Sequence, residues 1–456
     1  MMAAELVPLL VVGTLALLAL TLWLWRSSSL ETGTLRRLSL SKPTASVPAK
    51  RAEAPVDRTP RLEVPPLPAG AVAAGWREDG GRSVLVRPDG SRVGLTLEPA
   101  LQRRIESRLH RSKVPYAAVV VLDPKTGAVL AMAEKRAETG WIAEEHGLLK
   151  ANAPAASVFK LVTSAALLET GVRPDATVRY HGGSRGIEAH HLTADRRDNA
   201  DATLSDALAR SINPVFAKLA VDHLTAGGLA ATAEDLLFGH PIPFDMEVEP
   251  SRLAIEAGAL ALGRSAAGFE GSWISPLHAA LLAAAVANEG KLMRPYLVTD
   301  DSLQPGRVRQ PSEVGRALSR EHARQLGAMM VGTVAAGSAT RQFHPWPQKF
   351  ASVSVAGKTG TLDVRGEKYA GYTWFVGFAP ADDPKIAVAA LAVNERGWWV
   401  RGPTLARHAI VSWLELHPEA AGHPTDAAPS TGENAAGSPA QAAAAKKSSP
   451  NVVPGA

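Results

Sequence analysis

The sequence predicts a mixed α/β (α+β) fold in which helices flank one five-stranded antiparallel sheet. Two apolar runs at residues 117–122 and 128–133, separated by a Pro/Gly turn, are typical of a β-hairpin. Residues 154–334 then show mainly helical periodicity. Three more apolar runs follow, at residues 351–361, 372–378 and 385–394. Strands on both sides of a helical region indicate a single sheet that the helices cover.

Composition narrows the function classes. The chain has 456 residues, of which 46% are hydrophobic and 20% charged, as in proteins with a packed core. It has no cysteine, which excludes disulfides, thiolate metal sites and cysteine nucleophiles. The net charge is +5, and residues 26–68 contribute eight Lys/Arg against four Asp/Glu. Zinc-finger spacings, RNP-like motifs and basic helices are missing from the sequence, so we expect no nucleic-acid partner.

The N-terminal part predicts a membrane anchor. Residues 6–25 carry no charge and are long enough to span a bilayer, with Trp23 and Trp25 at the end where interfacial aromatics occur. A cleaved signal peptide and a buried core helix are the alternatives. The run has no basic segment before it and no A-x-A-like site close behind it. We therefore predict an uncleaved single transmembrane helix, although the arginines that follow it favour a cytoplasmic C-terminal side.

The remaining elements follow along the chain. We predict five regions: an anchor at 1–25, a disordered Pro/Ser-rich basic linker at 26–68, a small β element at 69–97, the main domain at 98–418 and a disordered Ala/Pro-rich tail at 419–456. Periodicity and Pro or Gly at the ends predict these helices: residues 99–109, 154–171, 201–219, 252–263, 276–288, 321–334 and 404–416.

The helix predicted at 154–171 carries a candidate nucleophile. Ser157 and Lys160 lie three residues apart and would project from the same face. A lysine can take the proton of a serine hydroxyl if burial or neighbouring cations keep it neutral. The spacing alone is common, and a second Ser-x-x-Lys at Ser39 and Lys42 falls in the linker. An ordinary surface pair is therefore the alternative until partners are found.

Two later motifs supply such partners. Ser211 could pass a proton between Lys160 and a leaving group, and Asn213 could hold both Lys160 and a substrate amide. Lys358 would add a second cation, which helps to keep Lys160 neutral and attracts a carboxylate.

The residues after Lys358 are candidates for substrate binding. Thr359, Gly360 and Thr361 continue the motif along a predicted strand, where an extended peptide could add to the edge. Gly360 leaves room for another backbone to approach. The amides of Ser157 and Thr361 could form an oxyanion hole.

In this order, S-x-x-K, S-x-N and K-T-G resemble the active site of penicillin-binding proteins and serine β-lactamases. Four further segments resemble those of penicillin-binding transpeptidases, and the likeness covers roughly residues 96–416. The segments are VLDPKTGAVLAM at 121–132, ALARSINPVF at 207–216, ISPLH at 274–278 and WFVGFAP at 374–380. The KTG at 125–127 precedes the nucleophile and lacks the trailing Thr, so we interpret it as a hairpin turn.

The resemblance implies a class B-like, monofunctional penicillin-binding transpeptidase with an all-helical subdomain, whose domain spans 98–418. Ser157 would attack the bond between two D-alanines of a peptidoglycan stem peptide and release the terminal D-alanine. An amine of a neighbouring stem would then resolve the acyl-enzyme, and β-lactams would acylate the same serine. It implies no cofactor and no metal.

This substrate lies outside the cytoplasm, so the implied location overrides the arginine asymmetry. We expect a single-pass protein of the cytoplasmic membrane with an extracytoplasmic (periplasmic) catalytic domain. No glycosyltransferase domain and no large pedestal stand between the span and the domain, so we expect a separate membrane-bound glycan polymerase as partner. A D,D-carboxypeptidase, a class D-like β-lactamase, a membrane-bound β-lactam sensor and an inactive scaffold remain alternatives.

Other polar clusters are predicted to have no catalytic or binding role. His190 and His191 lie in a polar stretch without metal-ligand spacing, so we interpret them as part of a solvated loop. Residues 196–198 are interpreted as a solvated charge run, and Trp398 and Trp399 as a packing or cleft-rim pair.

Overall fold

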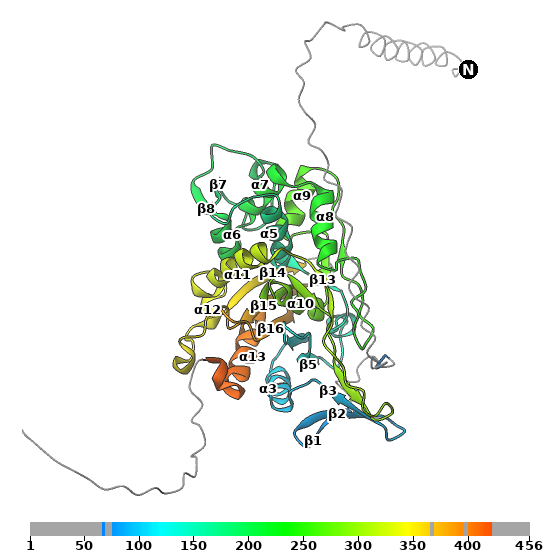
Figure 1. Cartoon of the computed structure of the whole chain (residues 1–456). Helices are drawn as coiled ribbons and strands as arrows, with labels where there is room; N and C mark the ends of the chain where they lie inside the picture. Colours follow the sequence, from blue (N-terminus) through cyan, green and yellow to red (C-terminus); the bar gives the residue numbers. More distant parts are fainter. Residues whose placement is uncertain (1–65, 69–74, 365–368, 396, 398–399, 422–456) are drawn as a thin grey trace, which may run out of the picture. The chain divides into compact units, whose positions relative to one another are not determined.

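The structure is a computed structural model that describes residues 66–68, 75–364, 369–395, 397 and 400–421 (Figure 1). The predicted anchor, nearly all of the predicted linker and tail, and the pair Trp398 and Trp399 lie outside these residues. Among the described helices, none is both long and apolar enough to cross a membrane. Residues 418–421, partly assigned to the tail, form a short 3-10 helix (Pro418–Ala421) whose last residue is buried.

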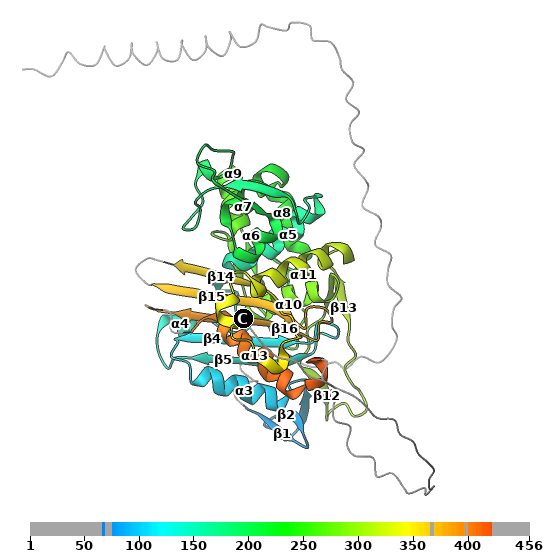
Figure 2. The same ribbon diagram turned by 90° about the vertical axis from the view of Figure 1, so that its left-hand side faces the viewer.

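A five-stranded antiparallel sheet forms the centre of the molecule, as predicted. Its strands lie in the order β14-β15-β16-β4-β5, so the two predicted groups of strands join where β16 pairs with β4. Figure 2 shows these strands from β14 to β5, with helices α5 to α9 beyond β14. The bounds are β14 (Ala356–Val364), β15 (Ala370–Ala379), β16 (Ile386–Asn394), β4 (Tyr116–Leu122) and β5 (Val129–Arg136).

Helices cover both faces of this sheet, which explains why its central strands are apolar throughout. Every residue of β4, β15 and β16 is buried. Because side chains alternate along a strand, Ala118 and Val120 belong to the core on the α10 side, and Val119 and Val121 to the core under α3 and α13. The covering helices are α3 (Pro99–His110), α10 (Pro276–Ala287), α11 (Arg320–Ala335) and α13 (Gly402–Leu416).

Helix α10 is the central helix of the molecule. All twelve of its residues are buried, so it is apolar all round rather than amphipathic. Its N-cap Ser275 accepts a hydrogen bond from the amide of His278. The His278 ring lies 2.7 Å from Ser251 Oγ and 2.6 Å from the carbonyl oxygen of Leu236, and burial lowers its pKa to about 4. A neutral ring thus ties α10 to the helical subdomain.

The helical subdomain lies beside the edge strand β14 and contains five helices. Two of the sequence predictions are wrong here. Residues 201–219 form strand β8 (Ala200–Thr203) and two helices that break at Ser211, and residues 252–263 begin with strand β9 (Arg252–Leu253), which pairs with β10 (Ser272–Ile274). The helices are α5 (Lys160–Glu169), α6 (Leu204–Arg210), α7 (Asn213–His223), α8 (Ala226–Asp235) and α9 (Ala259–Ala267).

A smaller, four-stranded sheet combines strands of the predicted small β element with one strand of the main domain. Strands β1 (Trp76–Asp79), β2 (Arg82–Val86) and β3 (Arg92–Leu95) are joined by β12 (Val298–Asp301), which comes from the main domain. Leu67, predicted in the linker, is buried, and its amide donates to the carbonyl of Asp245. Leu67 and the strands β1 to β3 are therefore in contact with segments of the main domain.

The short elements connect these parts and need only their bounds. They are α4 (Trp141–Glu145), β6 (Ala153–Pro154), β7 (Thr177–Tyr180), β11 (Lys291–Met293), β13 (Glu313–Arg316), α12 (Thr340–Phe343) and the 3-10 turns at Ala156–Phe159, Ala189–His191 and Gln348–Phe350. Strand β14 begins at Ala356 instead of the predicted 351, because residues 351–352 form a turn and residues 353–355 are irregular.

Candidate active site

The candidate nucleophile lies on a tight turn. The predicted helix at 154–171 begins only at Lys160, and Ser157 belongs to the 3-10 turn before it. Ala156 has a φ of +49°, an uncommon conformation for a residue with a side chain. Gly268 packs on this turn so closely that a Cβ there would lie 2.1 Å from the carbonyl oxygen of Ala156. The packing of Gly268 therefore holds the turn in a strained conformation.

Lys160 lies at the centre of the candidate site and is fully buried. Its Nζ is 2.8 Å from Oγ of Ser157, 2.8 Å from Oδ1 of Asn213 and 2.6 Å from the carbonyl oxygen of Ala267. A neutral amine has two N–H donors and one lone pair. With the donors directed to Asn213 and Ala267, the lone pair faces the hydroxyl of Ser157 and can accept its proton.

The surroundings favour this neutral form. Burial, and secondarily the positive charge of Lys358, lower the pKa of Lys160 well below 10.5. In the part of the chain that the structure describes, the three oxygens within hydrogen-bond distance of Nζ are all neutral, and none belongs to a carboxylate. The lysine is thus prepared to act as a general base rather than as half of an ion pair.

Ser211 stands where the two helices of the second motif separate. It ends α6 in a left-handed conformation with φ of +60°, and Asn213 begins α7 two residues later. Ser211 Oγ accepts a hydrogen bond of 3.0 Å from Nζ of Lys358. The sequence interpretation placed Ser211 next to Lys160, whereas here it contacts the other lysine.

Asn213 has a second partner that the sequence did not suggest. Its Oδ1 accepts from Lys160, while its Nδ2 donates to the carbonyl oxygen of Gly183 at 2.9 Å. The predicted contact of this amide with a substrate therefore relies on the remaining N–H of Nδ2.

Lys358 is the second fully buried cation of the site. Burial lowers its pKa from 10.5 to about 7. Its Nζ donates to Ser211 and to the carbonyl oxygen of Thr359. The group is therefore close to its titration midpoint at neutral pH. Among the described residues, its hydrogen-bond partners are neutral oxygens, so an anion would meet no competing carboxylate from them.

The rest of the third motif lies on the edge strand β14. Thr359 is buried and its hydroxyl is 2.5 Å from that of Ser338, a contact without a sequence signal. Thr361 is exposed. A Cβ on Gly360 would lie 3.1 Å from Cγ2 of Val158 and 3.3 Å from the carbonyl oxygen of Ala155. Gly360 thus lets the nucleophile turn approach the strand, whereas the sequence interpretation had reserved this space for a substrate peptide.

A cavity lies beside the outer part of β14. Leu362 and Val364 line it together with Gly268, on which the nucleophile turn packs. Trp273 and Phe269 are among its apolar lining residues, and three glutamates are among its polar ones. The candidate catalytic residues are not part of this lining.

A match to a protein-family model decides the family. Residues 117–407 match the family model of the penicillin binding protein transpeptidase domain, more than half of the chain. The chain belongs to this family.

Curated relatives of this penicillin-binding transpeptidase domain are similar over most of their length. The chain is 29% identical over 349 residues to peptidoglycan D,D-transpeptidase PbpA of Mycolicibacterium smegmatis, with 67% of each chain covered. It is 28% identical over 345 residues to PbpA of Mycobacterium tuberculosis, covering 67% of this chain and 68% of that one.

Solved structures show the same fold. The crystal structure of PBPA from M. tuberculosis superposes with a TM-score of 0.56 at 25% identity, covering 71% of this chain and 81% of that one. A D,D-transpeptidase domain from Eggerthella lenta superposes with a TM-score of 0.59 at 24% identity, covering 74% and 96%.

The second KTG of this penicillin-binding domain, at 125–127, lies away from the site. It occupies the turn between β4 and β5, where Lys125 is half exposed and pairs with Asp383 at 3.0 Å. Its interpretation as a turn is consistent with this position. Ser39 and Lys42 lie outside the described residues.

Two polar clusters differ from their predicted character. His191 is buried, and it lies with His181 and His190 in one group instead of in a solvated loop. Asp198, predicted in a solvated charge run, is buried and pairs with Lys218 at 2.6 Å. The prediction of solvated side chains failed because the groups that cover them come from other segments: His181 packs on the two histidines, and Lys218 pairs with Asp198.

Proposed function

We propose that this protein is a peptidoglycan D,D-transpeptidase that works through an acyl-enzyme on Ser157. The observation that carries the proposal is the buried amine of Lys160, 2.8 Å from Ser157 Oγ and beside a second buried lysine. The curated relatives bear the name peptidoglycan D,D-transpeptidase. A relative of known structure, penicillin-binding protein A of M. tuberculosis, has been solved as acyl-enzyme complexes with penicillin G, imipenem and ceftriaxone.

In the first half-reaction, Lys160 takes the hydroxyl proton while Ser157 Oγ attacks the carbonyl carbon between the two D-alanines. The amides of Ser157 and Thr361 stabilise the resulting oxyanion. Collapse breaks the peptide bond, and the leaving amine takes up the proton that Lys160 had accepted. Ser211, whose Oγ accepts a hydrogen bond from Nζ of Lys358, can relay this proton once the substrate lies between it and Lys160. D-Alanine leaves, and an ester joins the stem peptide to Ser157.

In the second half-reaction, the amine of a neighbouring stem attacks this ester. Lys160 accepts a proton from the amine, the new amide bond forms, and Ser157 regains its proton. A β-lactam enters the first half-reaction in the same way, because its strained amide takes the place of the D-Ala–D-Ala bond.

Substrate binding follows from the edge position of β14. A stem peptide adds to this strand through main-chain hydrogen bonds. Lys358 attracts the terminal carboxylate, and the hydroxyl groups of Thr359 and Thr361 lie on the same strand. The free N–H of Asn213 holds the substrate amide.

The cellular setting belongs to the same proposal. Residues 6–25 anchor the protein in the cytoplasmic membrane as a single span, and the catalytic domain lies on the outer, periplasmic side. The uncharged run in the sequence supports the anchor, and the location of peptidoglycan supports the side. A separate membrane-bound glycan polymerase supplies the strands that are cross-linked.

Intact-protein mass spectrometry tests the function. After incubation with penicillin, the mass should rise by one molecule per chain, and digestion should place the adduct on Ser157. Ser157→Ala should show no adduct. With a stem-peptide thioester, adding an acceptor amine should give cross-linked product, whereas water as the only acceptor would identify a carboxypeptidase. A label on another residue would overturn the assignment of the nucleophile.

A further inference from the structure

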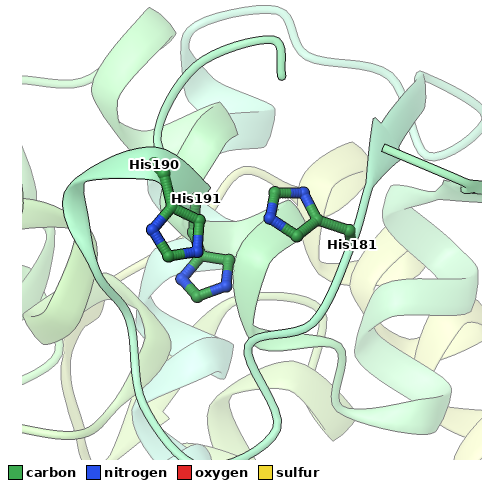
Figure 3. Close-up of side chains that lie close together, drawn as sticks. All are labelled: His181, His190 and His191. Carbon is green, nitrogen blue, oxygen red and sulfur yellow. The ribbon is translucent and has the colours of Figure 1, made fainter. Parts of the chain in front are cut away.

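Three histidines meet in the helical subdomain, outside the residues that the transpeptidase mechanism uses. His181 follows β7, whereas His190 and His191 belong to the 3-10 turn Ala189–His191. Each has a ring nitrogen that lies within 4.8 Å of those of the other two. Figure 3 shows the three imidazoles facing one another. The ring centroids are 5.2, 5.1 and 4.0 Å apart, so the cluster is compact.

His181 has a lone pair that the described protein does not use. Its Nδ1 is 2.6 Å from Oδ1 of Asp198, so the Nδ1–H donates to this carboxylate, and in the neutral ring the lone pair is on Nε2. Among the described residues, this buried Nε2 has no hydrogen-bond partner, and the side chain is only 10% exposed. In Figure 3 the ring of His181 is directed toward the other two rings. A buried, unpaired acceptor of this kind indicates a missing ligand.

The carboxylate that orients His181 is itself fixed. Asp198 Oδ2 accepts from Nζ of Lys218 at 2.6 Å and from the amide of Asp195 at 3.0 Å. A histidine whose second nitrogen donates to a held carboxylate is the usual arrangement around metal-binding imidazoles, because it sets both tautomer and ring orientation.

The rings of His190 and His191 differ in whether the Nε2 lone pair is available to bind a cation. His190 Nδ1 faces the carboxylate of Glu188 at 3.5 Å, which leaves its Nε2 available. His191 Nδ1 accepts from the amide of Glu188 at 3.0 Å, so its proton is on Nε2. His191 becomes a ligand through Nε2 when that proton moves to Nδ1. The change releases a single hydrogen bond from an exposed residue.

We propose that His181, His190 and His191 bind one divalent transition-metal ion, with Zn²⁺ the best match. Neutral imidazole is a preferred ligand of zinc and its neighbours in the first row. The ligand set contains no carboxylate, which disfavours Mg²⁺ and Ca²⁺.

The position of this site gives it a role next to the candidate active site. Gly183, two residues after His181, accepts the hydrogen bond from Nδ2 of Asn213. A Cβ on Gly182 would lie 3.0 Å from Nε2 of His191, so the chain packs closely on the cluster. A bound ion would therefore fix the loop whose carbonyl orients Asn213. This positioning role rests on the proposed function, whereas the binding of the metal does not.

Metal titration of the full chain tests the site. The purified protein, stripped with a chelator, is titrated with ZnCl₂ by calorimetry, and its melting temperature is followed with and without the ion. We expect one ion per chain and a higher melting temperature with Zn²⁺. His190→Gln should lower the affinity at least tenfold, because it removes a ligand from a half-buried position without disturbing Asp198.

His181→Gln keeps a donor for Asp198 and should have the same effect or a larger one. His223→Gln, an exposed histidine on α7, is the matched control and should leave the affinity unchanged. If one variant of the cluster does not fold, the other decides. Absence of binding, or equal loss in His190→Gln and His223→Gln, would overturn the proposal. Because the readout is binding, it is independent of acylation by β-lactams.

Discussion

At the scale of single residues, the two lysines of the site have different tasks that follow from their neighbours. Lys160 reaches Ser157, Asn213 and a main-chain carbonyl, whereas Lys358 reaches Ser211 and its own strand. Both are fully buried. The first is therefore suited to hold a lone pair next to the nucleophile, and the second to supply positive charge to a substrate.

Lys160→Ala should lower the acylation rate by about 10²–10⁴-fold, the usual effect of losing a general base. The rate is measured with a chromogenic or fluorescent penicillin, and the melting temperature shows that the variant folds. Lys125→Ala is the control, since that lysine also precedes a Thr-Gly but lies on an exposed turn. Near-normal acylation by Lys160→Ala would contradict the role of Lys160.

Lys358→Met should remove part of the pH dependence of stability. Burial lowers the pKa of Lys358 from 10.5 to about 7 in the folded protein. Between pH 7 and pH 10.5 the unfolded chain binds one more proton at this lysine than the folded protein does. The free energy of unfolding therefore rises with pH in this range, and the gain disappears as the pH falls toward 7. The difference in the free energy of unfolding between the wild type and Lys358→Met should change by on the order of 1 kcal/mol per pH unit.

Denaturant unfolding at several pH values between 7.5 and 9.5 measures this difference. The wild-type curve should rise more steeply with pH than the curve of Lys358→Met. Parallel curves would mean that Lys358 titrates near its ordinary pKa, and that it is a conventional cation at neutral pH.

The residues of the site show what a sequence can and cannot reveal. Ser157, Lys160, Ser211, Asn213 and Lys358 were found from their types and order, and the structure brings them together. The acceptors from Ala267 and Gly183 were missed, because any residue has a carbonyl oxygen. Asp198 and the histidines were misjudged because their partners are remote in sequence.

At the scale of elements, the sequence predicted strands and helices well where their own hydrophobic pattern determines the structure. The observed ends of seven elements differ from the predicted ends by two residues at most. These elements are the strands β4, β15 and β16 and the helices α3, α10, α11 and α13. Residues 252–263 failed because β9 is stabilised by pairing with β10, which follows it by almost twenty residues. The break at Ser211 needs a left-handed residue that carries a side chain, which propensity does not foresee.

Gly360→Ala tests the contact between β14 and the nucleophile turn. The added methyl group would lie 3.1 Å from Val158 Cγ2 and 3.3 Å from the carbonyl oxygen of Ala155, so the turn must shift by a few tenths of an ångström. Because catalysis depends on such placement, acylation should fall by at least about tenfold while the melting temperature changes little.

Gly357→Ala serves as the control on the same strand. Its Cβ would lie 2.2 Å from the ring of Phe375, away from Ser157, so it should reduce the melting temperature more than Gly360→Ala does. If Gly360→Ala acylates at the wild-type rate, the close approach of strand and turn is not needed for the reaction.

At the scale of the whole molecule, the described part is a transpeptidase domain to which the small sheet is packed. Leu67 fixes the chain to this domain through its burial and its hydrogen bond to Asp245. If the predicted linker at 26–68 is a flexible chain, its typical end-to-end distance is roughly 35 Å. This length supports the proposal that the domain stays near a bilayer.

The last prediction concerns the membrane span that we propose at residues 6–25. A span without charged residues offers no groups to conduct ions, so its tasks reduce to anchoring and contact with other helices. If it contacts a glycan polymerase, replacing residues 6–25 with an unrelated apolar span of equal length and orientation should reduce co-purification of the polymerase and cross-linking in cells. A matched control replaces residues 27–58 with another polar sequence of equal length, which changes the tether but not the span. The penicillin acylation rate of both variants should equal that of the wild type, since the catalytic domain is untouched. Unchanged co-purification and unchanged cross-linking after the span exchange would show that residues 6–25 only anchor the domain, and the proposed partner would lose its main support.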